Sequence, residues 1–297
     1  QTGVNIPLSA PADAAAADRT RPILKIQDGC NNRCSYCVIP FVRGRSRSLA
    51  PDAVIAEVRI LVRAGAREIV LSGINLGSYG RDLTPRAALA DVVHRILDET
   101  AVERLRFSSI EPQDVTEDFV TLVASSPRLA PHFHVPLQSG CDRILRAMHR
   151  WYRAAHYAER VRMIRRFAPD AAIGADVIVG FPGETDADFD ETAQFIAALP
   201  FTYLHVFSFS ERPGTAAANL GDRVPAQAIR ERARALRTLG EQKAAAFRAV
   251  QSGRTHRALM LARCGDNWTE GLTGNYLKVR VPGRHPANEW HEVPLQD

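Results

Sequence analysis

Short apolar runs alternate with longer segments of helical period along most of the chain. The apolar runs predict six strands, at residues 23–27, 68–72, 105–110, 132–137, 172–179 and 203–209. The segments between them predict helices at residues 51–64, 85–99, 116–125, 141–167 and 186–199. This alternation is typical of βα units around a parallel sheet. Six such units are fewer than the eight of a complete barrel, so we expect an open, partial (βα)6 barrel of the TIM type.

The last part of the chain changes character. A long basic helix is predicted at residues 225–250, and short strands follow at residues 255–262, 269–274, 276–281 and 290–295. We therefore expect a tail over residues 1–20, a core domain over residues 21–250 and a small β-barrel appendage over residues 251–297, short enough to lack its last strand. Small β-barrels of this kind often bind oligonucleotides.

Polar residues and glycines lie at or just beyond the ends of the predicted strands. They are Cys30, Gly73, Asn75, Ser109, Glu111, Gln138 and Gly180. In βα barrels the loops at the carboxyl ends of the strands carry the reactive groups, because these loops vary while the scaffold stays rigid. A single glycine at a strand end is usually only a turn, but packing does not explain the convergence of the whole set. We expect the active site at this rim.

Three cysteines, Cys30, Cys34 and Cys37, follow the first predicted strand at the spacing C-x3-C-x2-C. Three thiolates can hold three irons of a [4Fe–4S] cube, whereas a fully protein-ligated cluster needs four. One iron is then open to a small molecule. A structural zinc site needs a fourth Cys or His at compact spacing, and a disulfide suits a secreted protein, so both are weaker interpretations. Five cysteines, three of them in this motif, indicate a reducing cytoplasm.

The formal net charge of +5 and the pI of about 9.1 fit a polyanionic partner. Candidate RNA contacts are Arg43, Arg45 and Arg47, which follow the cysteine motif, and Lys278 and Arg280 in the appendage. The aromatic residues of the appendage either stack on RNA bases or form its own core; they are Trp268, Tyr276 and Trp290. No apolar run approaches the ~20 residues that span a bilayer, so we expect no membrane partner.

Seven segments together resemble the methylthiotransferase branch of the radical SAM superfamily. They are residues 26–31, 39–45, 72–77, 108–112, 137–142, 176–185 and 205–215. Tyr36, just before the third cysteine, completes a C-x3-C-x-aromatic-C spacing that is similar to the signature of the superfamily. The segments at residues 138–142 and 207–215 are most similar to the enzymes that convert N6-threonylcarbamoyladenosine at position 37 of tRNA to its 2-methylthio derivative. The resemblance runs from about residue 21 to the end of the chain.

The resemblance implies a [4Fe–4S] cluster on Cys30, Cys34 and Cys37, with S-adenosylmethionine (SAM) as the second cofactor. The SAM-binding residues that it implies are Tyr36, Gly73, Asn75, Ser109, Glu111, Gln138, Asp176 and Ile178. Cleavage of SAM then gives a 5′-deoxyadenosyl radical that takes hydrogen from adenine C2, and a sulfur methylated by a second SAM replaces it. The implied partners are the anticodon stem-loop of tRNA, around adenosine 37, and an electron donor such as flavodoxin or ferredoxin. The appendage resembles an RNA-binding TRAM domain.

Members of this branch normally carry an N-terminal domain with three further cysteines, which hold a second [4Fe–4S] cluster. Only Cys141 and Cys264 remain here, so we expect a fragment that begins in an interdomain linker and cleaves SAM without completing methylthiolation. One alternative is a sister methylthiotransferase that acts on isopentenyladenosine in tRNA or on a ribosomal-protein aspartate. Another is a non-catalytic iron–sulfur module that binds RNA. The polar residues at the strand ends argue against the latter, because RNA docking alone needs no SAM cradle.

Overall fold

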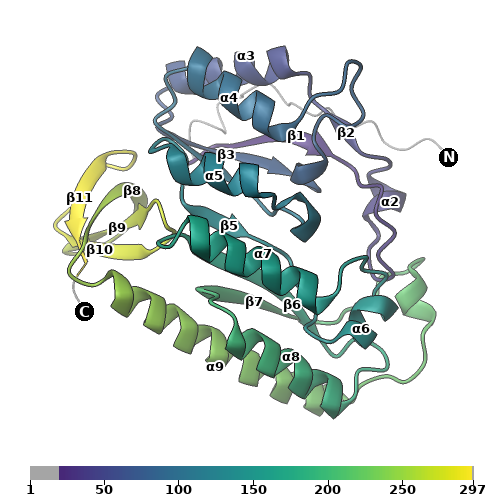
Figure 1. Cartoon of the computed structure of the whole chain (residues 1–297). Coiled ribbons are helices and arrows are strands. Elements are labelled where there is room, and N and C mark those ends of the chain that lie inside the picture. The colour runs from purple at the N-terminus through teal and green to yellow at the C-terminus, as the bar shows by residue number, and fades with distance from the viewer. Residues whose placement is uncertain (1–19, 296–297) are drawn as a thin grey trace.

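The computed structural model describes residues 20–295, so almost all of the predicted tail lies outside the described residues. Six parallel strands follow one another in space in the order of the chain (Figure 1). They are β1 (Ile23–Asp28), β3 (Glu68–Gly73), β4 (Arg104–Phe107), β5 (His132–His134), β6 (Ala172–Val179) and β7 (Tyr203–Ser208). Bridges such as Ser109–His134 join β4 to β5 and so connect the two halves of the sheet. The predicted partial barrel is confirmed.

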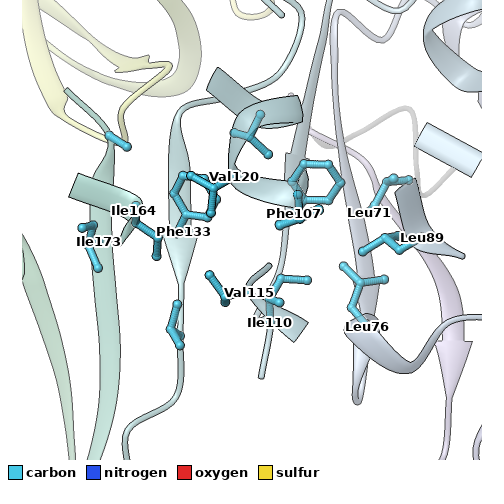
Figure 2. Close-up of a cluster of buried hydrophobic side chains, with 14 of the residues drawn as sticks. Leu71, Leu76, Leu89, Phe107, Ile110, Val115, Val120, Phe133, Ile164 and Ile173 are labelled. Atoms are coloured by element: carbon cyan, nitrogen blue, oxygen red, sulfur yellow. The ribbon is translucent and has the colours of Figure 1, made fainter. Parts of the chain in front are cut away.

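Helices cover the outer face of this curved sheet (Figure 1). They are α3 (Pro51–Arg63), α4 (Leu89–Glu99), α5 (Glu117–Ser125), α6 (Asp142–Ala147), α7 (Ala154–Phe167) and α8 (Asp186–Ala198). Their apolar faces pack on the strands to form the main core, part of which Figure 2 shows around Phe107, Val120 and Phe133. The ring of Phe119 meets Phe107 and Phe133 edge-on, at centroid distances of 5.2 and 6.3 Å. The core therefore lies between helices and sheet and leaves the inner face of the barrel to polar groups.

Several short elements were not foreseen. They are α2 (Ile39–Val42), the two-residue strand β2 (Arg47–Ser48), and the 3-10 turns η1 (Leu76–Ser78), η2 (Pro112–Asp114) and η3 (Ala216–Asn219). β2 pairs antiparallel with the end of β1 and so folds the loop after the cysteines back onto the sheet. The helix predicted from residue 85 begins only at Leu89, because Ala88 is extended and its N–H donates to Asp91 Oδ2 at 3.1 Å.

The single helix predicted at residues 141–167 is wrong, because the chain breaks between α6 and α7. His149 takes a left-handed conformation, with φ of 55°, and Arg150 N donates to Leu145 O at 2.8 Å to end the helix. A new helix then begins where Asp142 Oδ1 accepts a hydrogen bond from Ala154 N at 2.7 Å. The link between the helices turns toward the cysteine loop.

A long helix, α9 (Ala226–Gln251), leads from the barrel to the appendage. The appendage is a curled four-stranded antiparallel sheet, in the order β10-β9-β8-β11. Its strands are β8 (Thr255–Gly265), β9 (Trp268–Thr273), β10 (Lys278–Pro282) and β11 (Trp290–Pro294), which confirms the four predicted strands. None of the helices within residues 20–295 is long and apolar enough to cross a membrane.

The appendage docks on the amino-terminal ends of the barrel strands through two buried arginines. Arg104 donates to Leu272 O at 3.0 Å, and Arg106 donates to Thr273 O and Gly274 O at 3.1 and 2.9 Å. Both guanidinium groups also bind Glu68, which is fully buried at the start of β3. The appendage and the cysteine loop therefore lie at opposite ends of the barrel (Figure 1).

Candidate active site

The three motif cysteines lie on the loop that follows β1, at the carboxyl end of the barrel. All three are half-buried free thiols. The loop is closed by hydrogen bonds from Cys30 N to Gly44 O at 3.2 Å and from Cys37 N to Cys34 O at 3.1 Å. Burial raises the pKa of the Cys30 and Cys37 thiols. A metal ion bound at these thiols would favour the thiolate form.

A buried glutamine that the sequence did not single out joins this loop to the next strand end. Gln27 Nε2 donates to Gly29 O at 2.8 Å, and its Oε1 accepts from Asn75 N at 2.8 Å. A Cβ on Gly73 would lie 2.8 Å from Gln27 Oε1, so only glycine fits beside this clamp. Asn75 is buried, and its Oδ1 has no hydrogen-bond partner among the described residues. A buried acceptor of this kind is costly unless a ligand satisfies it.

The break between α6 and α7 brings Arg150 to the cysteine loop. Arg150 is buried, forms an ion pair with Glu111, and places Nη1 3.3 Å from Cys34 Sγ. Burial raises the pKa of Glu111, and the nearby guanidinium opposes that shift. Glu111, predicted to meet SAM, is thus already paired, and Arg150 is a site residue that the sequence reasoning missed.

A cavity of 280 Å³ gathers four of the predicted SAM-binding residues, Tyr36, Gln138, Asp176 and Ile178. The β7 end completes its lining with Phe207, Ser208, Phe209, Ser210 and Arg212. Gln138 adopts a left-handed φ of 67° and is held on both sides by β6, through Asp176 O and Ile178 N. Ser109 lies at the β4–β5 junction and is not among the residues that line this cavity.

The predicted RNA-binding residues differ in their exposure and in the ion pairs that they form. Arg47 donates to Asp28 at 3.0 Å, and Arg43 lies 4.0 Å from the same carboxylate, whereas Arg45 is exposed. Lys278 is exposed, 3.9 Å from Glu270.

The aromatic residues of the appendage divide between its surface and its docking interface. Arg280 stacks on Trp268, at 4.6 Å from the ring centroid. Trp290 is packed between Arg104 and Arg257, and Tyr276 stacks on His132 of the barrel. Two of the three aromatic residues therefore serve docking.

The two remaining cysteines are far apart in the fold. Cys141 is buried at the start of α6 and donates to Asp188 Oδ1 at 3.2 Å, while Cys264 is exposed on β8 of the appendage. Burial raises the pKa of Cys141 to about 12. The two do not form a second ligand set. The motif cysteines do fit a [4Fe–4S] cluster, since they offer three soft ligands on one loop.

Comparison with known proteins identifies the superfamily of the chain. The chain matches the radical SAM superfamily over residues 24–196, more than half of its length. It belongs to that superfamily. Enzymes of this superfamily use a [4Fe–4S] cluster with SAM.

Among curated proteins, it is 37% identical over 263 residues to the threonylcarbamoyladenosine tRNA methylthiotransferase MtaB of Aquifex aeolicus, covering 89% of this chain and 62% of that protein. It is also 45% identical over 200 residues to the tRNA-2-methylthio-N(6)-dimethylallyladenosine synthase of Syntrophobacter fumaroxidans, covering 67% of this chain and 44% of that protein. The chain thus spans less than two thirds of these relatives.

Solved structures confirm the fold. Coproporphyrinogen III oxidase (HemN) from Escherichia coli, a radical SAM enzyme, aligns with a TM-score of 0.56 at 15% identity, over 90% of this chain and 68% of that one. The radical SAM methyltransferase TsrM from Kitasatospora setae, solved with a [4Fe–4S] cluster bound, aligns with a TM-score of 0.56 at 17% identity, over 73% of this chain and 42% of that one.

Proposed function

We propose that this chain carries the radical SAM and RNA-binding parts of a tRNA methylthiotransferase that acts on N6-threonylcarbamoyladenosine at position 37. One observation carries the proposal: the C-x3-C-x2-C loop lies at the carboxyl end of the barrel, beside the cavity that Tyr36 and Asp176 line, in a chain that is 34–45% identical to tRNA methylthiotransferases. Cytoplasmic tRNA is the proposed substrate, and a flavodoxin or ferredoxin is the proposed electron donor.

When bound, the cluster and SAM supply the radical chemistry that removes hydrogen from a carbon. The chain's own residues then have three roles. Cys30, Cys34 and Cys37 would hold the cluster, and Arg150 donates a hydrogen bond to Cys34 Sγ and so orients this ligand. Gln27 fixes the distance between the cysteine loop and the loop that follows β3.

The SAM cradle is proposed at the carboxyl ends of β3, β4, β5 and β6. Gly73 and Asn75 would meet the methionyl end, where the unpartnered Asn75 Oδ1 can accept from the ammonium group. Tyr36, Gln138, Asp176 and Ile178 would border the adenine, because they share one cavity. Ser109 and Glu111 remain candidates for the ribose, with Glu111 oriented by Arg150.

The RNA-binding residues are proposed at both ends of the barrel. Arg45, beside Arg43 and Arg47, borders the cysteine loop, while Lys278 and Arg280 lie on the appendage. A strand of six to eight residues is about 20–25 Å long. One tRNA that touches both sites must therefore extend along the whole barrel, with adenosine 37 at the cysteine end.

The test begins with anaerobic reconstitution of the chain and assay of 5′-deoxyadenosine from SAM. Binding of anticodon stem-loop RNAs is then measured by fluorescence anisotropy, with adenosine 37 unmodified, dimethylallylated or threonylcarbamoylated. Tightest binding of the threonylcarbamoylated RNA supports the proposal. Tightest binding of the dimethylallylated RNA would favour the sister enzyme, which the sequence similarities also allow.

A further inference from the structure

A row of ionisable side chains lines the inner face of the barrel on β5, β6 and β7. Tyr203 Oη lies 2.7 Å from His132 Nε2 and 3.0 Å from His134 Nδ1. Asp176 Oδ1 lies 3.0 Å from His134 Nε2 and 3.2 Å from His205 Nδ1. One hydrogen-bonded chain therefore runs from His132, near the appendage, to His205, near the SAM cavity.

The sequence makes room for this chain. A Cβ at position 174 would lie 1.9 Å from Tyr203 Cζ, so only Gly174 lets the tyrosine ring cross the barrel between the two histidines. From the other side, Tyr276 of the appendage stacks on His132 with ring centroids 4.3 Å apart. The rings of His132 and Tyr203 therefore have packing contacts from both the barrel and the appendage.

The charge state of the chain's members follows from their surroundings. Burial opposes ionisation of Asp176, but the hydrogen bonds from His134 and His205 hold its pKa below the usual range, so it is a carboxylate. Burial lowers the pKa of His132 well below its usual value, so this imidazole is neutral. Burial raises the pKa of Tyr203, which keeps its proton.

With one proton on each imidazole, a single arrangement satisfies every contact. The Asp176 carboxylate only accepts, so His134 Nε2 and His205 Nδ1 both carry hydrogen. His134 Nδ1 accepts from the Tyr203 hydroxyl, which in turn accepts from His132 Nε2. His132 Nδ1 is left as a bare nitrogen, and it is indeed buried without a partner among the described residues.

We infer that His205 Nε2 is a hydrogen-bond acceptor for the N6 substituent of the substrate adenosine, and that it favours a urea-type substituent over an alkyl one. The inference deepens the proposed function and rests on it. His205 is half exposed and stands edge-on to Phe207, which lines the cavity. Asp176 fixes the proton on Nδ1, and this leaves the Nε2 lone pair free for a ligand. A threonylcarbamoyl group offers an additional N–H donor, whereas a dimethylallyl group offers none.

A metal ion is the competing occupant, because ligand atoms of His134, Asp176 and His205 lie within 4.8 Å of one another. A metal would need both nitrogens that face Asp176 without their protons. His134 would then donate to Tyr203, and Tyr203 to His132 Nε2. His132 Nδ1 would carry a buried proton with no acceptor. The hydrogen-bonded chain leaves a bare nitrogen at the same atom instead, so cobalt(II) titration distinguishes the two occupants.

Nitrogen NMR of the full chain, labelled with 15N-histidine, tests the arrangement directly. We expect the resonances of a His205 ring that carries its proton on Nδ1, and a shift in Asp176→Asn. A ring protonated at Nε2 would overturn the inference. Cobalt(II) titration supplies the metal arm, and stoichiometric uptake that His205→Phe abolishes would also overturn it.

The second test measures RNA preference. His205→Phe is expected to reduce the preference for threonylcarbamoylated over unmodified stem-loop RNA about tenfold. Affinity for unmodified RNA should not change. His205→Gln should restore part of the preference, because its amide oxygen accepts, and His94→Phe on the exposed face of α4 is the matched control.

Unchanged preference in His205→Phe would contradict the inference. If the wild-type chain binds none of the RNAs, the proposed function fails. Titration with free N6-threonylcarbamoyladenosine, followed by the His205 Nε2 shift, still tests the histidine on its own: a shift supports its role, and no shift refutes it.

Discussion

The buried ion cluster that joins the barrel to its appendage offers a sharp test of the fold. Glu68 is fully buried between Arg104 and Arg106, which are 6% and 2% exposed. Glu68→Gln keeps the shape of the side chain and removes the only carboxylate that these two guanidinium groups contact among the described residues. The two positive charges, two residues apart on β4, would then lie side by side without compensation.

The expected loss follows from the cost of a broken buried ion pair, about 3–5 kcal/mol. For domains of this size, each kcal/mol lowers the melting temperature by about 2–4 °C, so the variant should melt roughly 6–20 °C lower. Hydrogen exchange should accelerate first in β9, because Leu272 and Thr273 receive the two arginines. Glu159→Gln, at an exposed position of α7, is the control and should leave melting unchanged.

The pH dependence of stability is a second test of the Glu68→Gln variant. Although burial opposes it, Arg106 and Arg104 hold the pKa of Glu68 at about 2, below its ordinary value of 4.5. A lowered folded-state pKa stabilises the fold above the ordinary value, and this contribution disappears as the pH falls toward 2. The stability gap between wild type and variant should therefore be constant near neutrality and shrink below about pH 4.5. Calorimetry that finds equal melting at pH 7, with no faster exchange in β9, would refute the reasoning.

Three further predictions concern the site. Alanine at any motif cysteine should abolish the four irons and four sulfides expected per reconstituted cluster, whereas Cys264→Ala should keep them; iron loss in Cys264→Ala would contradict the ligand assignment. Gly73→Ala should weaken SAM binding in calorimetry by about tenfold or more without unfolding the chain, because its Cβ would displace Gln27 from the cysteine loop. Arg45→Glu should weaken stem-loop RNA binding and flatten its salt dependence, since each neutralised phosphate releases counterions; unaltered affinity at all salt concentrations would make this residue part of a solvated rim.

The positions of the barrel strands could be predicted from the sequence because each is an apolar run between helical segments. The polar interior could not. Residues 104–107 read Arg-Leu-Arg-Phe, a pattern typical of a strand with one wet face, yet all four are buried. Their arginines face Glu68 and the carbonyl groups of the appendage, a pairing between segments far apart in the chain. The alternation of residues along a strand indicates which face of the sheet each side chain is on. Whether that face is exposed to solvent depends on the tertiary fold.

The candidate site, too, could be predicted from the sequence only in part. The cysteine ligands are close in sequence, so their spacing is sufficient to identify them. The helix break at His149 cannot be identified from the local sequence. It depends on a tertiary hydrogen bond from Ser35 N to Met148 O, at 3.0 Å, which holds the link between the helices against the cysteine loop. Physical chemistry does indicate that Glu111 has a cationic partner, because a buried carboxylate is stable only when it is paired. Several arginines near residue 150 qualify, and only the break between α6 and α7 selects Arg150 and brings it within reach of Cys34.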